Sequence, residues 1–333
     1  MSGPAEPSAD DPALDPGVLA PLPLLEVQGW TAVARLGGLA ILPWRPQARQ
    51  AEAAGLTTLP RISAGLPSHA QALVRVTKGR TAVEADLAAA WSALTPGGRL
   101  VVAGPKDLGI ASVVKRLESL LGPGETLAQR AHQKIVAWTR GDQSLPCPTT
   151  PRVALGDGSD VTLGTAPGVF SHDALDEGTA TLLAVLADLP APSRVADLGC
   201  GAGHLGLAAL RRWPQATAWL GDADHRAVTV AQGNAQDLGL AGRATVAWWD
   251  AQEALPTGGF DLILTNPPAH AGAATSTDAA HAMFRVARAA LAPGGRLVVV
   301  ANRQLPYERP LAQLGRLTTM PSGPRFKVCV CHG

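Results

Sequence analysis

The chain contains few aromatic residues and has almost no net charge. Of its 333 residues, 4% are aromatic, one is a tyrosine, and the formal net charge is +1 at pH 7. So small a charge excludes an overall field that would draw the protein to nucleic acid or anionic lipid, although a local basic face can still bind either. The length is sufficient for two ordinary domains, each with its own core.

The chain also lacks the patterns of a metal site and of a membrane segment. Its four cysteines, Cys147, Cys200, Cys329 and Cys331, form no Cys-x-x-Cys pair and no His/Cys cluster at zinc spacing. Cys329 and Cys331 alternate in an apolar run, which predicts that they share one face of a strand. No apolar run approaches the roughly 18 residues of a membrane span. We therefore expect a cytoplasmic monomer with neither a metal nor a membrane partner.

Composition divides the chain into a tail, two domains and a linker. Residues 1–17 are rich in Pro, Ala, Ser and acidic side chains without periodicity, which predicts a disordered tail. Residues 141–166 carry several prolines and glycines and are typical of a linker between domains. The two domains are then expected at residues 18–140 and 167–333.

The two domains share an internal repeat. Residues 93–104 read ALTPGGRLVVAG, and residues 290–302 read ALAPGGRLVVVAN. Each copy indicates the end of an alanine-rich helix, a glycine that caps it, and a buried β-branched strand. A second matched pair lies upstream, LVRVTKGR at 73–80 and LILTNPP at 262–268. The repeat predicts two related α/β domains in tandem, with chance recurrence of a short turn as the alternative.

The first domain differs from the second where chemistry is expected. It lacks a glycine-rich turn between strand and helix, and residues 77–79 (Thr-Lys-Gly) stand where residues 266–268 (Asn-Pro-Pro) stand in the second. We therefore expect it to bind no cofactor. Its basic residues near the carboxyl edge of the expected sheet can hold RNA phosphates, namely Arg75, Lys78, Arg80 and Lys106. The alternative is that this domain only stabilises its partner.

A glycine turn in the second domain predicts a nucleoside cofactor. Residues 194–210 read RVADLGCGAGHLGLAAL, a strand, a tight turn and a helix. Gly199, Gly201 and Gly203 let the backbone approach a ligand that a Cβ atom would block. Asp197 at the strand end would repel a pyrophosphate, but it would attract the ammonium of an amino acid. The pattern therefore favours S-adenosylmethionine over a dinucleotide.

Two further strands support this cofactor. Residues 216–222 end in Asp222, whose carboxylate can accept both ribose hydroxyls, with Asp224 in the following turn as the competing candidate. Residues 244–250 (ATVAWWD) end in Asp250, which can accept the adenine amino group. The alternative is that these acids only cap helices.

The segment at 260–270, FDLILTNPPAH, carries the expected chemistry. An exocyclic amine on an aromatic ring is a poor nucleophile because its lone pair is conjugated. If the Asn266 side-chain oxygen and the Pro267 carbonyl each accept one N–H, the lone pair turns out of conjugation and points at the methyl group. Pro267 and Pro268 hold the backbone so that the carbonyls stay aimed. His270 is either a weak general base or a wall of the pocket.

Several motifs together resemble a known family. PGVFSHDALDEGT at 167–179, DLGCGAG at 197–203, TNPPAH at 265–270, VANRQLPY at 300–307 and RFKV at 325–328 are similar to the RsmC-like guanine-N2 methyltransferases of small-subunit (16S) ribosomal RNA. A large-subunit sister group is closely similar. The resemblance covers the chain well from about residue 167 onward, and the N-terminal half matches more loosely, as that family's degenerate duplicated domain.

The resemblance implies an α/β chain of two tandem Rossmann-like class I methyltransferase folds, the first degenerate. It implies S-adenosylmethionine as cofactor and ribosomal RNA or the small ribosomal subunit as partner, with an unpaired or flipped guanine as target. The residues implied at the site are Asn266, Pro267, Pro268 and His270 for catalysis, Phe170 and Asp176 beside the cofactor, and Tyr307 on the RNA.

The chain departs from the family at Ala269, where the family usually has a phenylalanine that can stack on the target base. Phe170 or Tyr307 is expected to replace that ring, whereas Trp248 and Trp249 are expected to line the adenine pocket or pack in the core. The alternative functions are methylation of 23S RNA, N5-methylation of a protein glutamine, and RNA binding by an assembly factor without catalysis.

Overall fold

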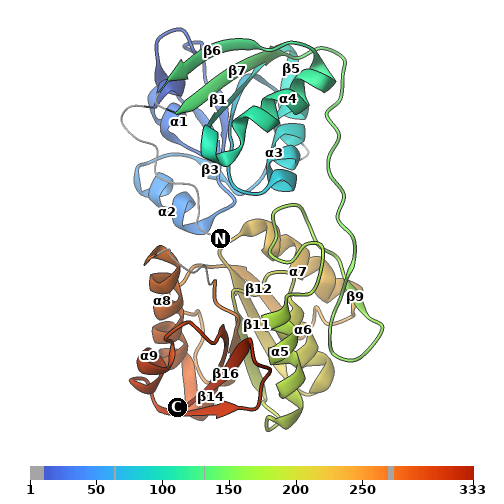
Figure 1. Ribbon diagram of the computed structural model, residues 1–333, viewed down its shortest axis with the longest axis vertical. Coiled ribbons are helices and arrows are strands. Elements are labelled where there is room, and N and C mark those ends of the chain that lie inside the picture. Colours follow the sequence, from blue (N-terminus) through green and yellow to red (C-terminus); the bar gives the residue numbers. More distant parts are fainter. Residues whose placement is uncertain (1–10, 64, 131, 269–273) are drawn as a thin grey trace. The chain divides into compact units, whose positions relative to one another are not determined.

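The structure is a computed structural model that describes residues 11–63, 65–130, 132–268 and 274–333. The described chain divides into two compact units, with the boundary between Thr149 and Thr150. Each unit is built around one large twisted sheet with helices packed on it (Figure 1). Within the described part of the chain, no helix has the length and apolar character of a membrane span.

The N-terminal unit alternates strands and helices before it ends in an antiparallel pair. Its elements are η1 (Pro12–Leu14), β1 (Leu24–Val27), α1 (Thr31–Leu36), β2 (Gly38–Ile41), α2 (Arg45–Ala53), β3 (Thr58–Leu59), β4 (His69–Arg75), α3 (Arg80–Ala93), β5 (Leu94–Pro105), η2 (Lys106–Leu108), α4 (Ile110–Leu121), β6 (Glu125–Arg130) and β7 (Gln133–Thr139).

The C-terminal unit repeats this plan after a short hairpin. Its elements are β8 (Val153–Ala154), β9 (Thr162–Leu163), α5 (Glu177–Val185), η3 (Leu186–Asp188), β10 (Arg194–Leu198), α6 (His204–Arg212), β11 (Thr217–Asp222), α7 (His225–Asp237), β12 (Ala244–Trp248), β13 (Phe260–Thr265), α8 (Ala274–Ala290), β14 (Leu291–Asn302), α9 (Glu308–Ala312), β15 (Arg316–Met320) and β16 (Phe326–His332).

The two sheets have the same topology. Their described strands run in the order β3-β2-β1-β4-β5-β7-β6 and β12-β11-β10-β13-β14-β16-β15. In each sheet the first five strands are parallel and the last two pair antiparallel. The predicted tandem of two doubly wound α/β folds is therefore confirmed, because chance recurrence of one turn would not reproduce a whole strand order.

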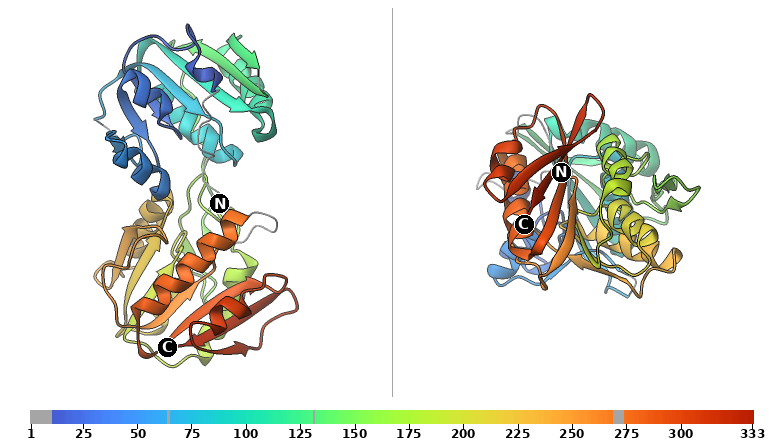
Figure 2. Two further views of the ribbon diagram at one scale, coloured as in Figure 1. Left: turned by 90° about the vertical axis from the view of Figure 1, so that its left-hand side faces the viewer. Right: turned by 90° about the horizontal axis from the view of Figure 1, so that it is seen from below.

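The C-terminal sheet is covered on both faces, and alternate residues of each strand enter different cores. On β10, Val195 packs in the layer of α5 and α6, whereas Ala196 packs in the layer of α8 and α9. Figure 2 shows these helix pairs on opposite sides of the sheet. Cys329 and Cys331 lie together in the second layer, as their alternation predicted.

The Pro-Gly-Gly segments differ from the prediction. Helices α3 and α8 end at Ala93 and Ala290, and a strand begins at the next residue in each case. The glycines therefore do not cap the helices. Gly97 and Gly294 have φ +75° inside β5 and β14, where the pairing with the neighbouring strand shifts register. Glycine is needed because this irregularity requires a left-handed backbone.

The domain boundaries also differ from those expected. The part of the predicted tail from Asp11 onward is ordered, since Asp11 is buried and caps η1, and Asp15 forms an ion pair with Arg130. The predicted linker contains the β8–β9 hairpin, which belongs to the C-terminal unit. Burial and ion pairing of acidic side chains are decided by partners far along the chain, so composition misassigned these residues.

Candidate active site

The expected cofactor residues converge at the carboxyl edge of the C-terminal sheet. β10 and β13 are neighbours, but the chain leads from β10 through α6 to β11 and from β13 through α8 to β14 on the other side, which makes this a topological switch point. In open parallel sheets, ligands bind outside the carboxyl ends of the strands at such a point. The glycine turn follows β10, Asp222 ends β11, and Asn266 directly follows β13.

The glycine turn is tied to the neighbouring strand. The Gly201 backbone N–H donates to Asp222 Oδ2 at 2.8 Å, and the Gly199 N–H donates to the Gly221 carbonyl. Gly203 has φ +92° and a Cβ atom there would lie 2.9 Å from Leu207, so the turn requires glycine. Apart from the adjoining residues, no atom of the described part of the chain lies within 4 Å of a Cβ atom placed on Gly201, so the turn leaves space for a ligand beside its backbone.

Asp197 is completely buried at the end of β10. Its Oδ2 accepts a hydrogen bond from the Gly206 N–H at 2.8 Å, and its Oδ1 has no partner among the residues that the structure describes. Burial, with a contribution from Asp222, raises the pKa of this carboxyl to about 7. The contact observed is with the first turn of α6, which Asp197 anchors. That Asp197 attracts the ammonium of an amino acid stays a prediction.

The buried Asp197 predicts a pH-dependent stability difference. In the unfolded chain this carboxyl ionises near its ordinary pKa of 3.8, but in the folded protein it keeps its proton to about pH 7. The stability that it contributes is therefore fully present below about pH 4 and is lost as the pH rises through 7. We expect Asp197→Asn to be increasingly more stable than the parent protein over this range, by a few kcal/mol at about pH 8, at about 1.4 kcal/mol per pKa unit.

Thermal unfolding of the two ligand-free proteins from about pH 4 to 8 measures this difference. Burial lowers the pKa of His204 to about 4, so this residue makes the protein more stable as the pH rises. Both proteins contain His204, and its contribution therefore cancels in the difference between them. A constant gap between the two proteins would contradict the assignment of a raised pKa to Asp197.

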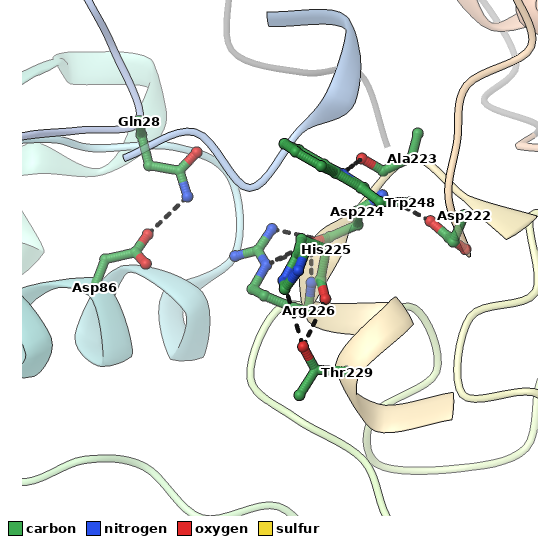
Figure 3. A network of polar contacts seen from close by, with 9 residues as sticks. All are labelled: Gln28, Asp86, Asp222, Ala223, Asp224, His225, Arg226, Thr229 and Trp248. Atoms are coloured by element: carbon green, nitrogen blue, oxygen red, sulfur yellow. Dashed lines mark hydrogen bonds and ion pairs between the residues drawn. The ribbon is translucent and has the colours of Figure 1, made fainter. Parts of the chain in front are cut away.

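Asp222 is the better placed of the two ribose candidates (Figure 3). Its Oδ1 accepts from the Asp224 N–H and its Oδ2 from the Gly201 N–H, both at 2.8 Å. Burial raises its pKa to about 6. Asp224 is instead occupied as the N-cap of α7 and forms an ion pair with Arg226. The competing candidate is therefore a helix cap.

The two tryptophans at the end of β12, Trp248 and Trp249, have different roles. Trp249 is buried against Trp219, with 5.6 Å between ring centroids, and so packs in the core. Trp248 is half-buried, donates from Nε1 to the Ala223 carbonyl and meets the His225 ring edge-on. Asp250 follows them and accepts from the Gln252 N–H, so its contact with adenine stays a prediction.

Asn266 is held by two side chains of the DEGT segment. Its Nδ2 donates to Asp176 Oδ2 at 2.8 Å and to Thr179 Oγ1 at 3.0 Å. Asp176 also caps α5 through the Thr179 N–H. Because a carboxylate can only accept, the amide nitrogen must face Asp176, and Asn266 Oδ1 is the atom left to accept a hydrogen bond from a substrate amine. The geometry is the one that the proposed chemistry needs.

Two of these residues have roles that the sequence did not reveal. Thr179 was not singled out, although it lies in the quoted motif, and Asp176 was expected beside the cofactor but contacts Asn266. Asn234 was missed altogether. This buried side chain pairs with both backbone groups of Gly164 and donates to the Ala202 carbonyl, so it ties the segment before the PGVFS motif to the glycine turn. A polar residue in a helix gives no signal of such a role.

The two aromatic side chains expected to contact the target base differ in their exposure. Tyr307 is 1% exposed and packs edge-on against Phe284 of α8, so the expectation that it contacts RNA is wrong. Phe170 is 50% exposed and stays a candidate. Pro267 and Pro268 follow β13 as expected, whereas Ala269 and His270 lie outside the described residues.

In the N-terminal unit, Arg75 takes the place of Asn266. The pairing of β4 with β5 and of β13 with β14 makes Leu73 equivalent to Leu264, counted from the shared Gly-Gly. Two residues further on, Arg75 is equivalent to Asn266. The sequence comparison had placed residues 77–79 there, two residues too far along. The register of the strands corrects that alignment.

Arg75 is a largely enclosed structural residue and not an RNA contact as expected. By the same register Glu26 occupies the position of Asp197, and it accepts from the Val33 N–H of the following helix. The Arg75 guanidinium pairs with Glu26 and with Asp11, each at 2.6 Å. A Cβ atom on Gly29 would lie 2.5 Å from the arginine side chain. The equivalent cofactor site is thus filled by an ion-pair cluster.

The other expected basic contacts remain available. Lys78, Arg80 and Lys106 are exposed at the carboxyl edge of the N-terminal sheet. The loop after β1 is shaped by Gln28, which has φ +64° and donates to Asp86 at 2.8 Å (Figure 3). It has no glycine turn like that after β10.

Comparisons with known proteins agree with this geometry. The family model described as Methyltransferase small domain matches residues 160–330. The chain is 36% identical to the Ribosomal RNA small subunit methyltransferase C of Chromohalobacter salexigens, over 73% of this chain and 72% of the relative. It is also 36% identical to the Ribosomal RNA large subunit methyltransferase G of Ectopseudomonas mendocina, over 77% and 69%.

A solved structure extends the likeness to both units. The T. thermophilus 16S rRNA N2 G1207 methyltransferase (RsmC), in complex with AdoMet and guanosine, aligns with a TM-score of 0.80 and 27% identity over 93% of this chain and 88% of that one. The chain therefore belongs to the methyltransferase small-domain family, in the group of RsmC-like ribosomal RNA methyltransferases.

Proposed function

We propose that this protein transfers the methyl group of S-adenosylmethionine to the exocyclic N2 amine of a guanine in small-subunit ribosomal RNA. The observation that carries the proposal is the carboxamide of Asn266, whose nitrogen is held by Asp176 and Thr179 so that its oxygen is left as the acceptor. The whole-length likeness to a protein that binds AdoMet and guanosine supports the choice of cofactor and base.

The residues at the sheet edge fit the cofactor. The open turn at Gly201 admits a ligand close to the backbone, and the carboxyl of Asp222 stands beside it for the ribose hydroxyls. Asp197 has a buried oxygen without a partner among the described residues, which suits a cationic amino acid nearby. When bound, the cofactor supplies an electrophilic methyl group.

The chain's own part in the reaction is to orient the amine. Asn266 Oδ1 and the Pro267 carbonyl each accept one N–H of the guanine amine, which turns its lone pair out of conjugation and toward the methyl group. The two acceptors also stabilise the ammonium character that develops on nitrogen. A strong general base is not required, because the methylated ammonium is acidic enough to lose its proton to water.

Two alternatives are less favoured. Methylation of a protein glutamine does not account for a duplicated N-terminal unit. An assembly factor without catalysis does not account for the intact hydrogen bonds that hold Asn266. Methylation of large-subunit RNA is a stronger alternative, since the small-subunit and the large-subunit relative are each 36% identical to this chain. The full-length structural likeness favours the small subunit. We further propose that the protein acts as a cytoplasmic monomer, where ribosomal subunits assemble.

Methyl transfer to separated RNAs tests the proposal. The purified full chain with labelled S-adenosylmethionine should modify unmethylated 16S RNA or small subunits, and mass spectrometry of digests should place the methyl group on guanine N2. Matched reactions with 23S RNA and with protein substrates serve as controls. Labelling of 23S RNA alone would overturn the choice of subunit, and labelling of a glutamine would overturn the choice of RNA.

A further inference from the structure

The N-terminal unit contains a cavity that neither the cofactor nor the proposed reaction uses. It has a volume of about 570 Å³ and opens between α3 and α4, at the carboxyl ends of β4 and β5. Its apolar floor includes Val83, Leu87, Leu117 and Leu145. This size falls within the range of small-molecule sites, and the carboxyl edge of a parallel sheet is where such sites form.

The cavity exists because the N-terminal unit lacks a set of rings that fill the equivalent space of the catalytic unit. Between α8 and α9, Phe284 and His281 pack against Tyr307, with ring centroids 5.2 and 6.2 Å from that of the tyrosine. Counted back from the ends of α3 and α8, Leu87 and Glu84 stand at the positions of Phe284 and His281.

The third ring is replaced by a smaller side chain. Counted from the shared Gly-Gly, Ile110 at the start of α4 stands at the position of Tyr307. Leu87 and Glu84 line the cavity, as does Gly109 beside Ile110. The same fold therefore packs three flat rings in one unit and leaves an apolar slot in the other, so the slot has room for a ring from outside.

The rim of the cavity is basic. Arg80, Lys115 and Arg116 line it and are exposed, against the single acidic residue Glu84, which pairs with Arg80 at 3.0 Å. Lys115 and Arg116 form no ion pair within the described part of the chain. An apolar slot for a ring beside two such cations is the combination that binds a nucleobase with its phosphate.

We propose that this cavity binds one unpaired nucleotide of the RNA substrate, with its base between α3 and α4 and its phosphate at Lys115 and Arg116. The proposal rests on the RNA substrate of the proposed function and adds a second contact point in the degenerate unit. A contact of this kind positions the RNA by stacking and charge and is tolerant of base identity, because every base has a flat apolar face.

The test compares two tryptophan substitutions in the full chain. Ser112 lies on α4, is exposed and lines the cavity, whereas its neighbour Ala111 is equally exposed and does not line it. We expect Ser112→Trp to fill the slot and weaken binding of 16S RNA at least tenfold in filter-binding titrations, while Ala111→Trp binds as the parent does. Calorimetric affinity for S-adenosylmethionine should stay unchanged in both.

A second variant removes the positive charges at the rim and leaves the apolar slot unfilled, so it tests the rim separately. Lys115→Ala with Arg116→Ala should weaken RNA binding and reduce the log–log salt slope by about 0.7 for each single-strand phosphate that the protein no longer neutralises. Arg61→Ala, at an exposed position outside the cavity, is the matched control and should change neither.

The outcomes separate this proposal from the proposed function. If the parent protein methylates guanine in 16S RNA but Ser112→Trp and the charge variant bind RNA as tightly as their controls, the cavity does not hold RNA and the proposal is overturned. If the variants bind weakly but methylation falls on another base, the cavity proposal stands and the proposed function fails. If the parent protein forms dimers and Ser112→Trp abolishes them, the cavity binds a second copy of the chain and the proposal is overturned.

Discussion

Replacing Asn266 with alanine is expected to slow methyl transfer by about two orders of magnitude or more, while the affinity for S-adenosylmethionine stays unchanged. The substitution removes the acceptor that orients the amine but leaves the glycine turn and Asp222 in place. Single-turnover rates with 16S RNA and calorimetric titration of the cofactor measure the two quantities separately.

Two further variants, at Asn266 and at its partner Thr179, test the same role. Asn266→Asp keeps the shape and the acceptors but loses the Nδ2 donor, and it places a second carboxylate against Asp176. We expect it to be slow as well, because like charges at hydrogen-bond distance force the side chain away. Thr179→Ser retains the hydroxyl that Asn266 uses and is the matched control. Rates within a few-fold of the parent in Asn266→Ala would refute the orienting role.

Replacing Arg75 with alanine is expected to lower the free energy of unfolding of the N-terminal unit by about 3–5 kcal/mol, the usual cost of breaking a buried ion pair from one side. The substitution leaves Glu26, which is fully buried, without its partner, and it leaves Asp11 in the same state. Burial opposes the charge of the guanidinium, but the two carboxylates outweigh it and raise the pKa of Arg75.

A double variant distinguishes the ion pair from simple loss of packing. Arg75→Met with Glu26→Gln removes both charges and keeps most of the volume, so we expect it to recover most of the stability that Arg75→Ala loses. Chemical denaturation, followed by hydrogen exchange to assign each transition to its unit, gives the comparison. An Arg75→Ala protein as stable as the parent would show that the cluster does not hold this unit together.

The features that could be predicted from the amino-acid sequence are those that depend on local backbone chemistry. The glycine turn after Asp197 and the Asn-Pro-Pro segment are short, and their geometry follows from glycine at positive φ and from the fixed angles of proline. Repeated at long range, the same local patterns also predicted two tandem folds of one type. These elements were found where they were expected.

Which side chains meet depended on the folding of the whole chain. Asp176 and Asn266 lie 90 positions apart in the chain, and Arg75 and Glu26 lie 49 apart, so their contacts depend on strand order. The irregular pairing at the Gly-Gly segments sets the register that makes Arg75, and not Thr77, the counterpart of Asn266. Register is a property of paired strands, and one strand's sequence does not contain it.

Burial was likewise a tertiary outcome. Tyr307 was expected on the RNA, but the packing of α9 against α8 encloses it, whereas smaller side chains at the equivalent positions of the other unit leave a cavity. An aromatic side chain is stabilised by burial against an apolar surface of the protein, and it is equally able to stack on a flat ligand if it stays exposed. Which of the two occurs depends on whether a neighbouring helix covers it, and that is decided only when the helices pack.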